Sequence, residues 1–299
     1  MAVPQPGIFA QGTRSHYHLE FDLRPGADDA GICEALGRLR EPSVTAGGTN
    51  IVVGFGPDLW RRLRPDDAPG NLAPFETIEG NGRIAPATQH DIWVWSHGMS
   101  EDLELDVARA VVASLAPVAT LAQEQAGFVY RDSRDLTGFI DGTENPPVEK
   151  AHNVALVASG QPGAGGAHVI TMRWVHDLAA FQAQAVGEQE AAIGRTKLDS
   201  VELADKPPTA HISRVVIEED GQELEIYRRS VPYGRVGELG LYFVAFSADP
   251  SRFIKMLRNM FGTSGDGLHD HLTDFTAPVS GSFYFAPSLD ALEGILPSD

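Results

Sequence analysis

The sequence predicts an α+β fold built from two similar ferredoxin-like units in tandem. Two observations predict it: strand patterns alternate with single helical stretches along the chain, and the order of these patterns repeats in the second half. The composition agrees with a folded protein, because 42% of the 299 residues are hydrophobic and 21% are charged. A prior of about 150 residues per domain gives two units. We expect an N-terminal half at residues 1–135 and a C-terminal half at residues 136–299.

The first half shows three strand patterns. Residues 16–23 alternate between apolar and polar side chains, and a helical stretch follows near residues 28–39. Residues 50–56 form an apolar run that is typical of a buried strand, and a helix begins at Pro57. Residues 91–96 close this set with aromatic and β-branched side chains.

The second half repeats this order. Its strand patterns are residues 167–175, 241–246 and 282–286. A helical stretch at residues 178–192 follows the first of them, and a helix capped by Asp249 follows the second. We match the strands of the two halves one to one in chain order, which leaves an insertion at residues 193–234. Since function is often added to a repeated scaffold in such insertions, we expect much of the functional site there.

Charge and cysteine content exclude several classes of partner. The chain has 23 Lys and Arg against 41 Asp and Glu, a formal net charge of −18, which argues against nucleic acid and anionic membranes. The single cysteine, Cys33, cannot form an intrachain disulfide or a cysteine-rich metal site, and it fits a reducing compartment. The N-terminus has no readable secretion signal and no apolar stretch is long enough for a membrane span. We therefore expect a cytoplasmic protein without a membrane partner.

The segment between the halves, residues 136–147, is unusual for a linker. Two glycines surround Asp141 and two prolines follow, which indicates an ordered irregular loop whose backbone can approach a flat or bulky group. Phe139 and Ile140 would place the Asp141 carboxylate beside an apolar wall, where burial raises its pKa and suits it to proton transfer. The alternative interpretation is an ordinary Asp-Gly turn.

Several motifs resemble one enzyme family. Gly138-Phe139-Ile140-Asp141-Gly142-Thr143 resembles the G-x-x-D-G signature of the dye-decolourising haem peroxidases, and Glu144-Asn145-Pro146 is similar to their bacterial class B branch. Further similar segments follow in the family's order at residues 173–177, 193–197, 211, 228–234 and 240–243. The resemblance covers essentially the whole chain. It implies a pair of ferredoxin-like units of the dimeric α+β barrel-like superfamily, in agreement with the fold predicted above.

The resemblance implies one haem b per subunit, with His211 as the axial ligand of its iron. His211 is expected just before a strand at residues 213–218. A ligating imidazole normally donates its other N–H to a carboxylate or carbonyl. Asp274 is the first choice for this partner, and Asp270 is the alternative.

On the face where peroxide would bind, the resemblance implies a pair formed by Asp141 and Arg228. The carboxylate would move a proton between the peroxide oxygens, and the guanidinium would stabilise the negative charge that develops. Which of the two dominates stays open. Ser230 would share a strand face with Arg228 and orient peroxide or water, whereas Arg229 would point to the opposite face.

The other haem contacts implied by the resemblance are of three kinds: backbone and small side chains of the signature, basic side chains for the two propionates, and an apolar wall. They are Gly142 and Thr143; Arg195 with Arg173 and His176 as weaker candidates; and Leu241 and Phe243.

The function implied is a peroxidase that uses hydrogen peroxide to oxidise dyes, phenolic compounds or other organic electron donors through a ferryl intermediate. A homo-oligomer, a dimer or larger, is expected. Bulky donors would need electron relays at the surface, and the candidates are Trp174, Tyr227, Tyr242 and Tyr284. Two alternatives remain: a haem carrier or deferrochelatase-like protein that releases iron, and a metal-binding module at residues 269–271.

Overall fold

The computed structural model describes residues 2–39 and 48–297. The first half forms four main strands, each antiparallel to its neighbours: β1 (Ser15–Leu23), β2 (Asn50–Phe55), β5 (Ile92–Gly98) and β6 (Ala119–Phe128). Two helices connect them, α1 (Asp29–Arg38) between β1 and β2 and α4 (Glu101–Leu115) between β5 and β6. The strands lie in the order β6-β1-β5-β2, which is that of a ferredoxin-like unit.

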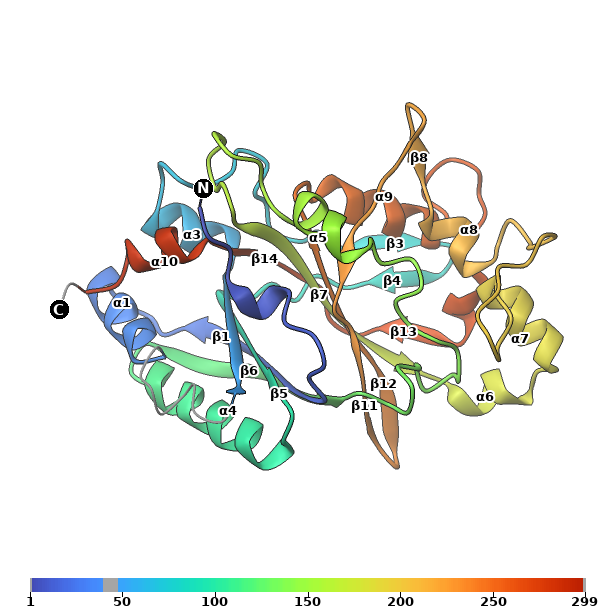
Figure 1. The fold of residues 1–299 in the computed structure, drawn as a ribbon, viewed down its shortest axis with the longest axis horizontal. Coiled ribbons are helices and arrows are strands. Elements are labelled where there is room, and N and C mark those ends of the chain that lie inside the picture. The colour runs from blue at the N-terminus through green and yellow to red at the C-terminus, as the bar shows by residue number, and fades with distance from the viewer. Residues whose placement is uncertain (1, 40–47, 298–299) are drawn as a thin grey trace.

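The second half builds the same unit. Its main strands are β7 (Ala167–His176), β10 (Tyr227–Arg228), β12 (Glu238–Ser247) and β14 (Ser282–Ala286), in the order β14-β7-β12-β10. The helices between β7 and β10 are α6 (Leu178–Ala183), α7 (Val186–Ile193) and α8 (His211–Val215), and α9 (Ser251–Met260) joins β12 to β14. Figure 1 shows α1 and α4 at one end of the molecule and α6, α7 and α8 at the other.

Shorter elements complete the chain. They are η1 (Pro6–Ile8), α3 (Pro57–Leu63), β3 (Ile78–Gly80), β4 (Arg83–Ala85), α5 (Val148–Ala155), β8 (Glu218–Glu219), β9 (Gln222–Glu223), β11 (Val231–Arg235), η3 (His271–Asp274), β13 (Thr276–Pro278) and α10 (Leu289–Glu293). None of the helices in the described part of the chain is long and apolar enough to cross a membrane.

The predicted matching of strands between the halves is wrong. The strand at residues 241–246 takes the third position of its unit, so it corresponds to β5, and the two-residue strand β10 corresponds to β2. The error arose because β2 and β12 are both apolar strands followed by a helix, α3 and α9, and local pattern does not show position in a sheet. The fourth strand, β6, was missed because most of its side chains are polar or exposed.

One sheet connects the two units. β14 pairs with β2 through Phe285 and Phe55, so the edges of the two ferredoxin-like sheets are joined. At the other end β11 packs against β6, where a Cβ on Gly127 would lie 2.5 Å from the Val231 side chain. Only glycine allows this approach. The ten-stranded sheet therefore curves round toward a closed barrel, which confirms the predicted fold class.

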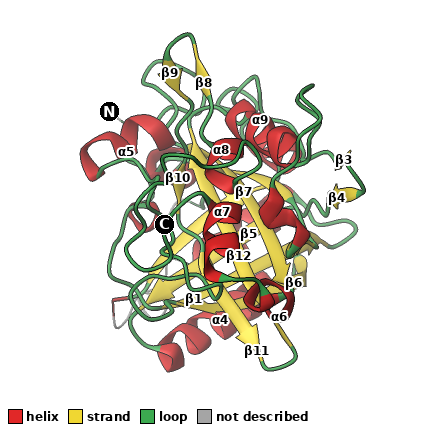
Figure 2. Ribbon diagram, turned by 90° about the vertical axis from the view of Figure 1, so that its right-hand side faces the viewer, coloured by secondary structure: helices red, strands yellow, loops and turns green. Residues whose placement is uncertain are grey.

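Alternation along the strands separates an inner from an outer face of this barrel. On β12, Tyr242, Val244 and Phe246 belong to an inner cluster that also contains Trp93 and Tyr284. The side chains between them on β12 face outward and pack with α9. In Figure 2 the strands lie between α4 on one side and α8 and α9 on the other. The outer face under α8 and α9 is the surface on which a site can be built.

The predicted helix near residues 28–39 agrees with the structure, whereas two other predicted elements differ from it. Asp28 accepts a hydrogen bond from the Gly31 N–H at 2.8 Å and starts α1, as the predicted helix near residues 28–39 requires. The predicted helix at 178–192 is two helices, α6 and α7, because Gln184 adopts an extended conformation. The predicted strand at 213–218 begins as the end of helix α8, and only its last residue, Glu218, belongs to a strand, β8.

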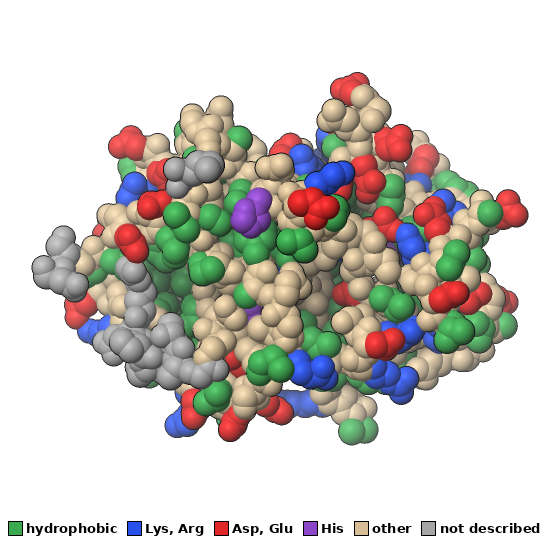
Figure 3. All heavy atoms as spheres, in the orientation of Figure 1, with side chains coloured by type: hydrophobic (Ala, Val, Ile, Leu, Met, Phe, Trp, Pro, Cys, Tyr) green, Lys and Arg blue, Asp and Glu red, His purple; other side chains and the backbone are tan. Residues whose placement is uncertain are grey.

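Acidic and basic side chains are interspersed over the molecular face in Figure 3. The excess of acidic residues is therefore spread over this face and does not form a separate segment.

Candidate active site

A large cavity lies between the outer face of β7 and β12 and the helices α8 and α9, and the 135–144 loop and β10 complete its wall. It holds about 1490 Å³ of empty space, including its opening to solvent. Its apolar wall consists of Ile170, Met172 and Trp174 from β7, Leu241 and Phe243 from β12, and Phe253, Met256, Leu257 and Met260 from α9. Strand alternation and one face of α9 thus create an apolar wall, and Leu241 and Phe243 belong to it.

The loop between the halves carries Asp141 into this cavity. Gly138 and Gly142 have positive φ of 94° and 79°, a backbone conformation that glycine adopts without strain. The Asp141 N–H donates to the Ser133 carbonyl at 3.0 Å, and one carboxylate oxygen of Asp141 accepts the Gly142 N–H at 2.7 Å. Burial raises the pKa of Asp141, and the positive charge of Arg228 opposes this shift only in part. Gly142 and Thr143 also line the cavity.

Arg228 reaches the same cavity from β10. Its backbone is held by the loop, because the Arg228 N–H donates to Asn145 Oδ1 at 2.8 Å and Asn145 Nδ2 donates to the Arg228 carbonyl at 2.9 Å. The Arg228 Nε is buried and has no hydrogen-bond partner within the described residues. Nor does an ion pair join Arg228 to Asp141 in this part of the chain. Both charged groups are thus free to act on a ligand, and Asn145 couples their positions.

His211 is the first residue of α8 and lines the cavity. Its Nδ1 lies 2.6 Å from Asp270 Oδ2. Asp270 is fully buried, and its other oxygen accepts the Leu272 N–H at 2.9 Å at the start of η3. A carboxylate at Nδ1 favours the tautomer with a proton there, so the Nε2 lone pair of His211 remains available to a metal.

Asp274, the first choice for this partner, does not contact His211. It forms ion pairs with Arg83 and with His271, whose Nδ1 lies 2.8 Å from Asp274 Oδ2. Asp270 and Asp274 lie at opposite ends of the short helix η3, so only the first of them faces α8. Within the described residues no group of three or more His, Cys, Asp or Glu side chains could hold a metal ion, which removes the metal-binding module at 269–271.

His176 also lines the cavity, together with a carboxylate that the sequence did not single out. The His176 Nε2 lies 3.2 Å from Asp135 Oδ2, and its Nδ1 lies 2.7 Å from Thr276 Oγ1. Burial disfavours the charged form of Asp135, but hydrogen bonds from His176 and Thr137 outweigh it and lower the pKa of Asp135. Asp135 directly precedes the predicted loop, and no motif marks it.

The structure places three other predicted site residues in different surroundings. Arg195 lines the cavity and has a buried Nε without a partner within the described part of the chain, but it also forms an ion pair with Glu144. Arg173 lies outside the cavity, where its Nη1 contacts Glu238 Oε1 at 2.6 Å. Ser230 is not part of the cavity wall either, since its Oγ accepts the Val244 N–H at 3.3 Å. Neither Arg173 nor Ser230 lines the cavity in this structure, and their roles stay predictions.

The four aromatic residues predicted as surface relays are all buried. Trp174 lines the cavity, whereas Tyr242 and Tyr284 are fully enclosed inside the barrel and Tyr227 is 5% exposed. Arg229 faces the interior, with its guanidinium 5.1 Å from the Trp95 ring, as the alternation from Arg228 predicts.

Comparisons with known proteins assign a family. The model described as Dyp-type peroxidase, N-terminal, matches residues 5–129, and that described as Dyp-type peroxidase, C-terminal, matches residues 132–291. A dye-decolorizing peroxidase of Rhodococcus erythropolis is 36% identical over 307 residues, which cover 98% of this chain and 89% of the relative.

Two solved structures agree with these matches over nearly the whole chain. A dye-decolorizing protein from V. cholerae is 35% identical with a TM-score of 0.89, and covers 97% of this chain and 99% of its own. A variant of DypB from Rhodococcus jostii in complex with heme is also 35% identical, with a TM-score of 0.92 and coverage of 97% and 98%. Sequence and fold lead to the same result: the chain belongs to the Dyp-type peroxidase family.

Proposed function

We propose that this haem peroxidase binds one haem b per subunit in the cavity under α8 and α9, and uses hydrogen peroxide to oxidise dyes, phenolic compounds or related organic donors. The observation that carries the proposal is the arrangement of His211 with its buried partner Asp270, and of Asp141 and Arg228, around one apolar cavity. A homo-oligomer in a reducing cytoplasm is part of the proposal, on the grounds of family resemblance and of the single cysteine.

The residues present fit a haem. A tetrapyrrole is flat and apolar except for its two propionates, and the walls from β7, β12 and α9 offer a matching surface. His211 would hold the iron through Nε2, with Asp270 at Nδ1 increasing the basicity of the ring. When bound, haem supplies an iron centre that hydrogen peroxide oxidises and that organic donors then reduce one electron at a time.

Arg195 and His176 are the proposed partners of the propionates. Both line the cavity, and the buried Arg195 Nε has no partner within the described residues. A bidentate pair between a guanidinium and a carboxylate is among the stronger polar contacts in proteins. Glu144 already contacts Arg195, so a propionate would share this arginine or displace Glu144 from it.

Asp141 and Arg228 would divide the work on peroxide. Asp141 would take a proton from one peroxide oxygen and return it to the other, which would then leave as water. Its raised pKa brings it nearer to the range in which a carboxyl group both accepts and donates a proton. Arg228 is permanently charged, and it stabilises the negative charge that develops as the oxygen–oxygen bond breaks.

The test is a haem titration followed by peroxide. We expect the protein to bind one haem per chain, to change its haem absorption spectrum with one equivalent of hydrogen peroxide, and then to oxidise a phenolic dye. His211→Ala should lose or alter the haem band, whereas His90→Ala, a change at a histidine that contacts Asp22 away from the cavity, should leave it unchanged.

Two results would overturn the proposal. An unaltered haem band in His211→Ala would remove the assigned ligand. Haem binding without peroxide-dependent dye oxidation would favour the carrier or iron-releasing alternative.

A further inference from the structure

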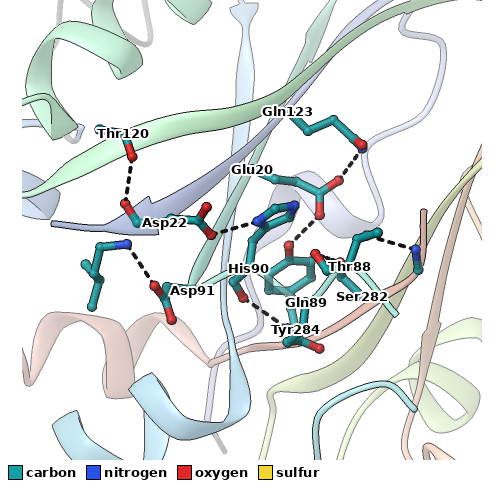
Figure 4. A network of polar contacts seen from close by, with 12 residues as sticks. Glu20, Asp22, Thr88, Gln89, His90, Asp91, Thr120, Gln123, Ser282 and Tyr284 are labelled. Carbon is teal, nitrogen blue, oxygen red and sulfur yellow. Dashed lines mark hydrogen bonds and ion pairs between the residues drawn. The ribbon is translucent and has the colours of Figure 1, made fainter. Parts of the chain in front are cut away.

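The inside of the barrel contains a polar cluster that the proposed reaction has not used. The Glu20 carboxylate on β1 accepts hydrogen bonds from Tyr242 at 2.7 Å, from Tyr284 at 2.5 Å and from Gln123 Nε2 at 2.7 Å. Figure 4 shows Glu20 between Gln123 and Tyr284. Glu20 is 1% exposed and both tyrosines are fully buried. We call Glu20, Tyr242 and Tyr284 the tyrosine–glutamate cluster.

Burying a polar cluster of this kind in a protein core costs free energy. A buried carboxylate needs strong compensation, usually from a cation, and no Lys, Arg or His forms an ion pair with Glu20 in the described part of the chain. Two phenol groups and one amide hold it instead. Burial and the nearby Glu20 raise the pKa of both phenols well above their ordinary value of 10, so both remain protonated. Each phenolic proton already points to a base.

The cluster adjoins the cavity wall. Tyr242 lies on β12 between Leu241 and Phe243, which both face the cavity, so its backbone is part of that wall. The paired strand β7 follows the same pattern, because Tyr242 is paired with Arg173, and the residues on either side of Arg173, Met172 and Trp174, line the cavity. Tyr242 is therefore separated from the proposed haem site by the thickness of one sheet.

Further oxidisable rings continue from the cluster across the barrel. Tyr284 stacks on Trp93 with ring centroids 6.0 Å apart and an angle of 20° between the ring planes. Trp93 in turn stacks on Trp95 at 6.1 Å and 21°. All these side chains belong to the shared inner core of buried residues.

We propose that the tyrosine–glutamate cluster stores one oxidising equivalent as a tyrosyl radical, with Glu20 as the proton acceptor. This inference rests on the proposed function, which supplies hydrogen peroxide as the oxidant. Tyr242 gives one electron to the peroxide-oxidised site and its phenolic proton to Glu20, which leaves a neutral phenoxyl radical and a neutral carboxylic acid. An electron from an organic donor and the return of the proton from Glu20 restore both groups. Tyr284, bonded to the other carboxylate oxygen, shares the radical by the same exchange.

The experiment is electron paramagnetic resonance of the haem-loaded protein, frozen rapidly after one equivalent of hydrogen peroxide. The expected result is an organic radical whose hyperfine pattern narrows when the protein contains ring-deuterated tyrosine. Tyr242→Phe with Tyr284→Phe should abolish the signal. Tyr17→Phe is the matched control, because Tyr17 is buried on the outer face of β1 and does not contact Glu20. In this control the signal should persist.

Glu20→Gln separates proton transfer from packing. Glutamine keeps the size of the side chain and one hydrogen-bond acceptor but cannot take the phenolic proton. We expect loss of the tyrosyl signal with an unchanged haem absorption band and circular dichroism spectrum. If Glu20→Gln does not fold, the two single tyrosine variants decide the question by the same signal.

The outcomes distinguish the two proposals. A haem spectrum that responds to peroxide without any tyrosyl radical, or with one that survives in the double tyrosine variant, overturns the cluster and leaves the peroxidase intact. A tyrosyl signal that survives in Glu20→Gln removes Glu20 as the proton acceptor. A haem spectrum that does not respond to peroxide overturns both proposals.

Discussion

Asp141 combines two properties that rarely occur together: it is a carboxyl group with a raised pKa, and an arginine faces the same cavity without pairing with it. Burial disfavours the charged carboxylate, and the tight Asp-Gly turn holds its direction. Asn145 holds the Arg228 backbone, and the guanidinium forms no ion pair with any described residue. At the scale of single residues, the site is a pair of charged groups kept apart for a ligand.

Asp141→Asn tests proton transfer. Asparagine has a similar size but cannot take up or release a proton, so we expect kcat for dye oxidation to fall by about 100-fold or more. The parent's rate of reaction with peroxide should fall as the pH drops through the raised folded pKa of Asp141, because the neutral carboxyl group cannot take the peroxide proton. Steady-state rates against pH check both expectations. A flat parent profile, or a variant with parental rates, would contradict the assigned role.

The same substitution should also change how the free energy of unfolding depends on pH. The pKa of Asp141 is raised from 3.8 in the folded protein, so its contribution to stability is fully present below about pH 3.8 and is lost as pH rises through the folded pKa. Asn does not titrate. The free energy of unfolding of Asp141→Asn relative to the parent should therefore increase between pH 3 and pH 7. Urea unfolding at several pH values measures it, and a decrease would contradict burial as the cause.

Asp270 and Asp274 form a matched pair for testing the axial ligand. Asp270→Asn removes the carboxylate from His211 Nδ1, and loss of such a partner typically costs 10- to 100-fold in metal affinity or activity. Asp274→Asn alters contacts with Arg83, His269 and His271, none of which lines the cavity, so haem affinity should stay the same. Haem titration followed by absorption measures both variants. Equal losses in the two would refute the assignment.

At the scale of elements, the loop and β10 form one unit. The side chain of Asn145 satisfies both backbone groups of Arg228, at 2.8 and 2.9 Å, so residues distant in sequence are held in register. β10 is only two residues long and pairs with β12 on one side. On the side away from β12, the short strand β10 thus forms its hydrogen bonds with the side chain of Asn145 from the loop.

Asn145→Ala should loosen this junction. It leaves an N–H and a carbonyl of Arg228 without partners, and each such group costs about 1–3 kcal/mol when buried. We expect a lower free energy of unfolding and a slower reaction with peroxide, since Arg228 is no longer held. Asn153→Ala is the control, because Asn153 is exposed on α5. Urea unfolding and stopped-flow spectra measure the two effects, and parental values in Asn145→Ala would contradict the coupling.

At the scale of the whole molecule, the two halves share their inner core. Trp93 and Trp95 of the first half pack with Tyr242, Phe246 and Tyr284 of the second, and β2 pairs with β14. The site itself uses little of the first half, since the cavity is lined by residues 135–276. The first half therefore contributes chiefly by closing the barrel behind the cavity wall.

Residues 1–135 expressed alone should not form a folded monomer. Separation would expose the inner cluster and the free edge of β2, and both favour association or unfolding. Addition of residues 136–299 should restore the soluble fold. Size-exclusion chromatography with circular dichroism measures this, and a monomeric, cooperatively folding first half would contradict the shared core. The boundary at residue 135 remains a prediction until such fragments are made.

The outcomes for single residues show what motifs can and cannot locate. The residues that the family resemblance and strand alternation indicated do line one cavity in the structure: His211, Asp141, Arg228, Leu241 and Phe243. Ser230 and Arg173 lie outside the cavity wall, since the direction of a side chain near an irregular strand or at the edge of a cavity depends on distant contacts, and their roles stay predictions. Asp135 carries no motif, and its role appears only beside His176.

By itself, the sequence predicted the α+β class and, through resemblance, the family, and both are confirmed, because periodic burial and compact motifs are local properties of the chain. The site residues that it indicates stay predictions. Only the tertiary structure decided which strand of one half corresponds to which strand of the other. It also decided that Asp270 contacts His211 and that Glu20 accepts hydrogen bonds from two tyrosines of the other half. These are contacts between residues 59 to 264 positions apart. They arise from the closure of the sheet, which brings together side chains that no local pattern relates.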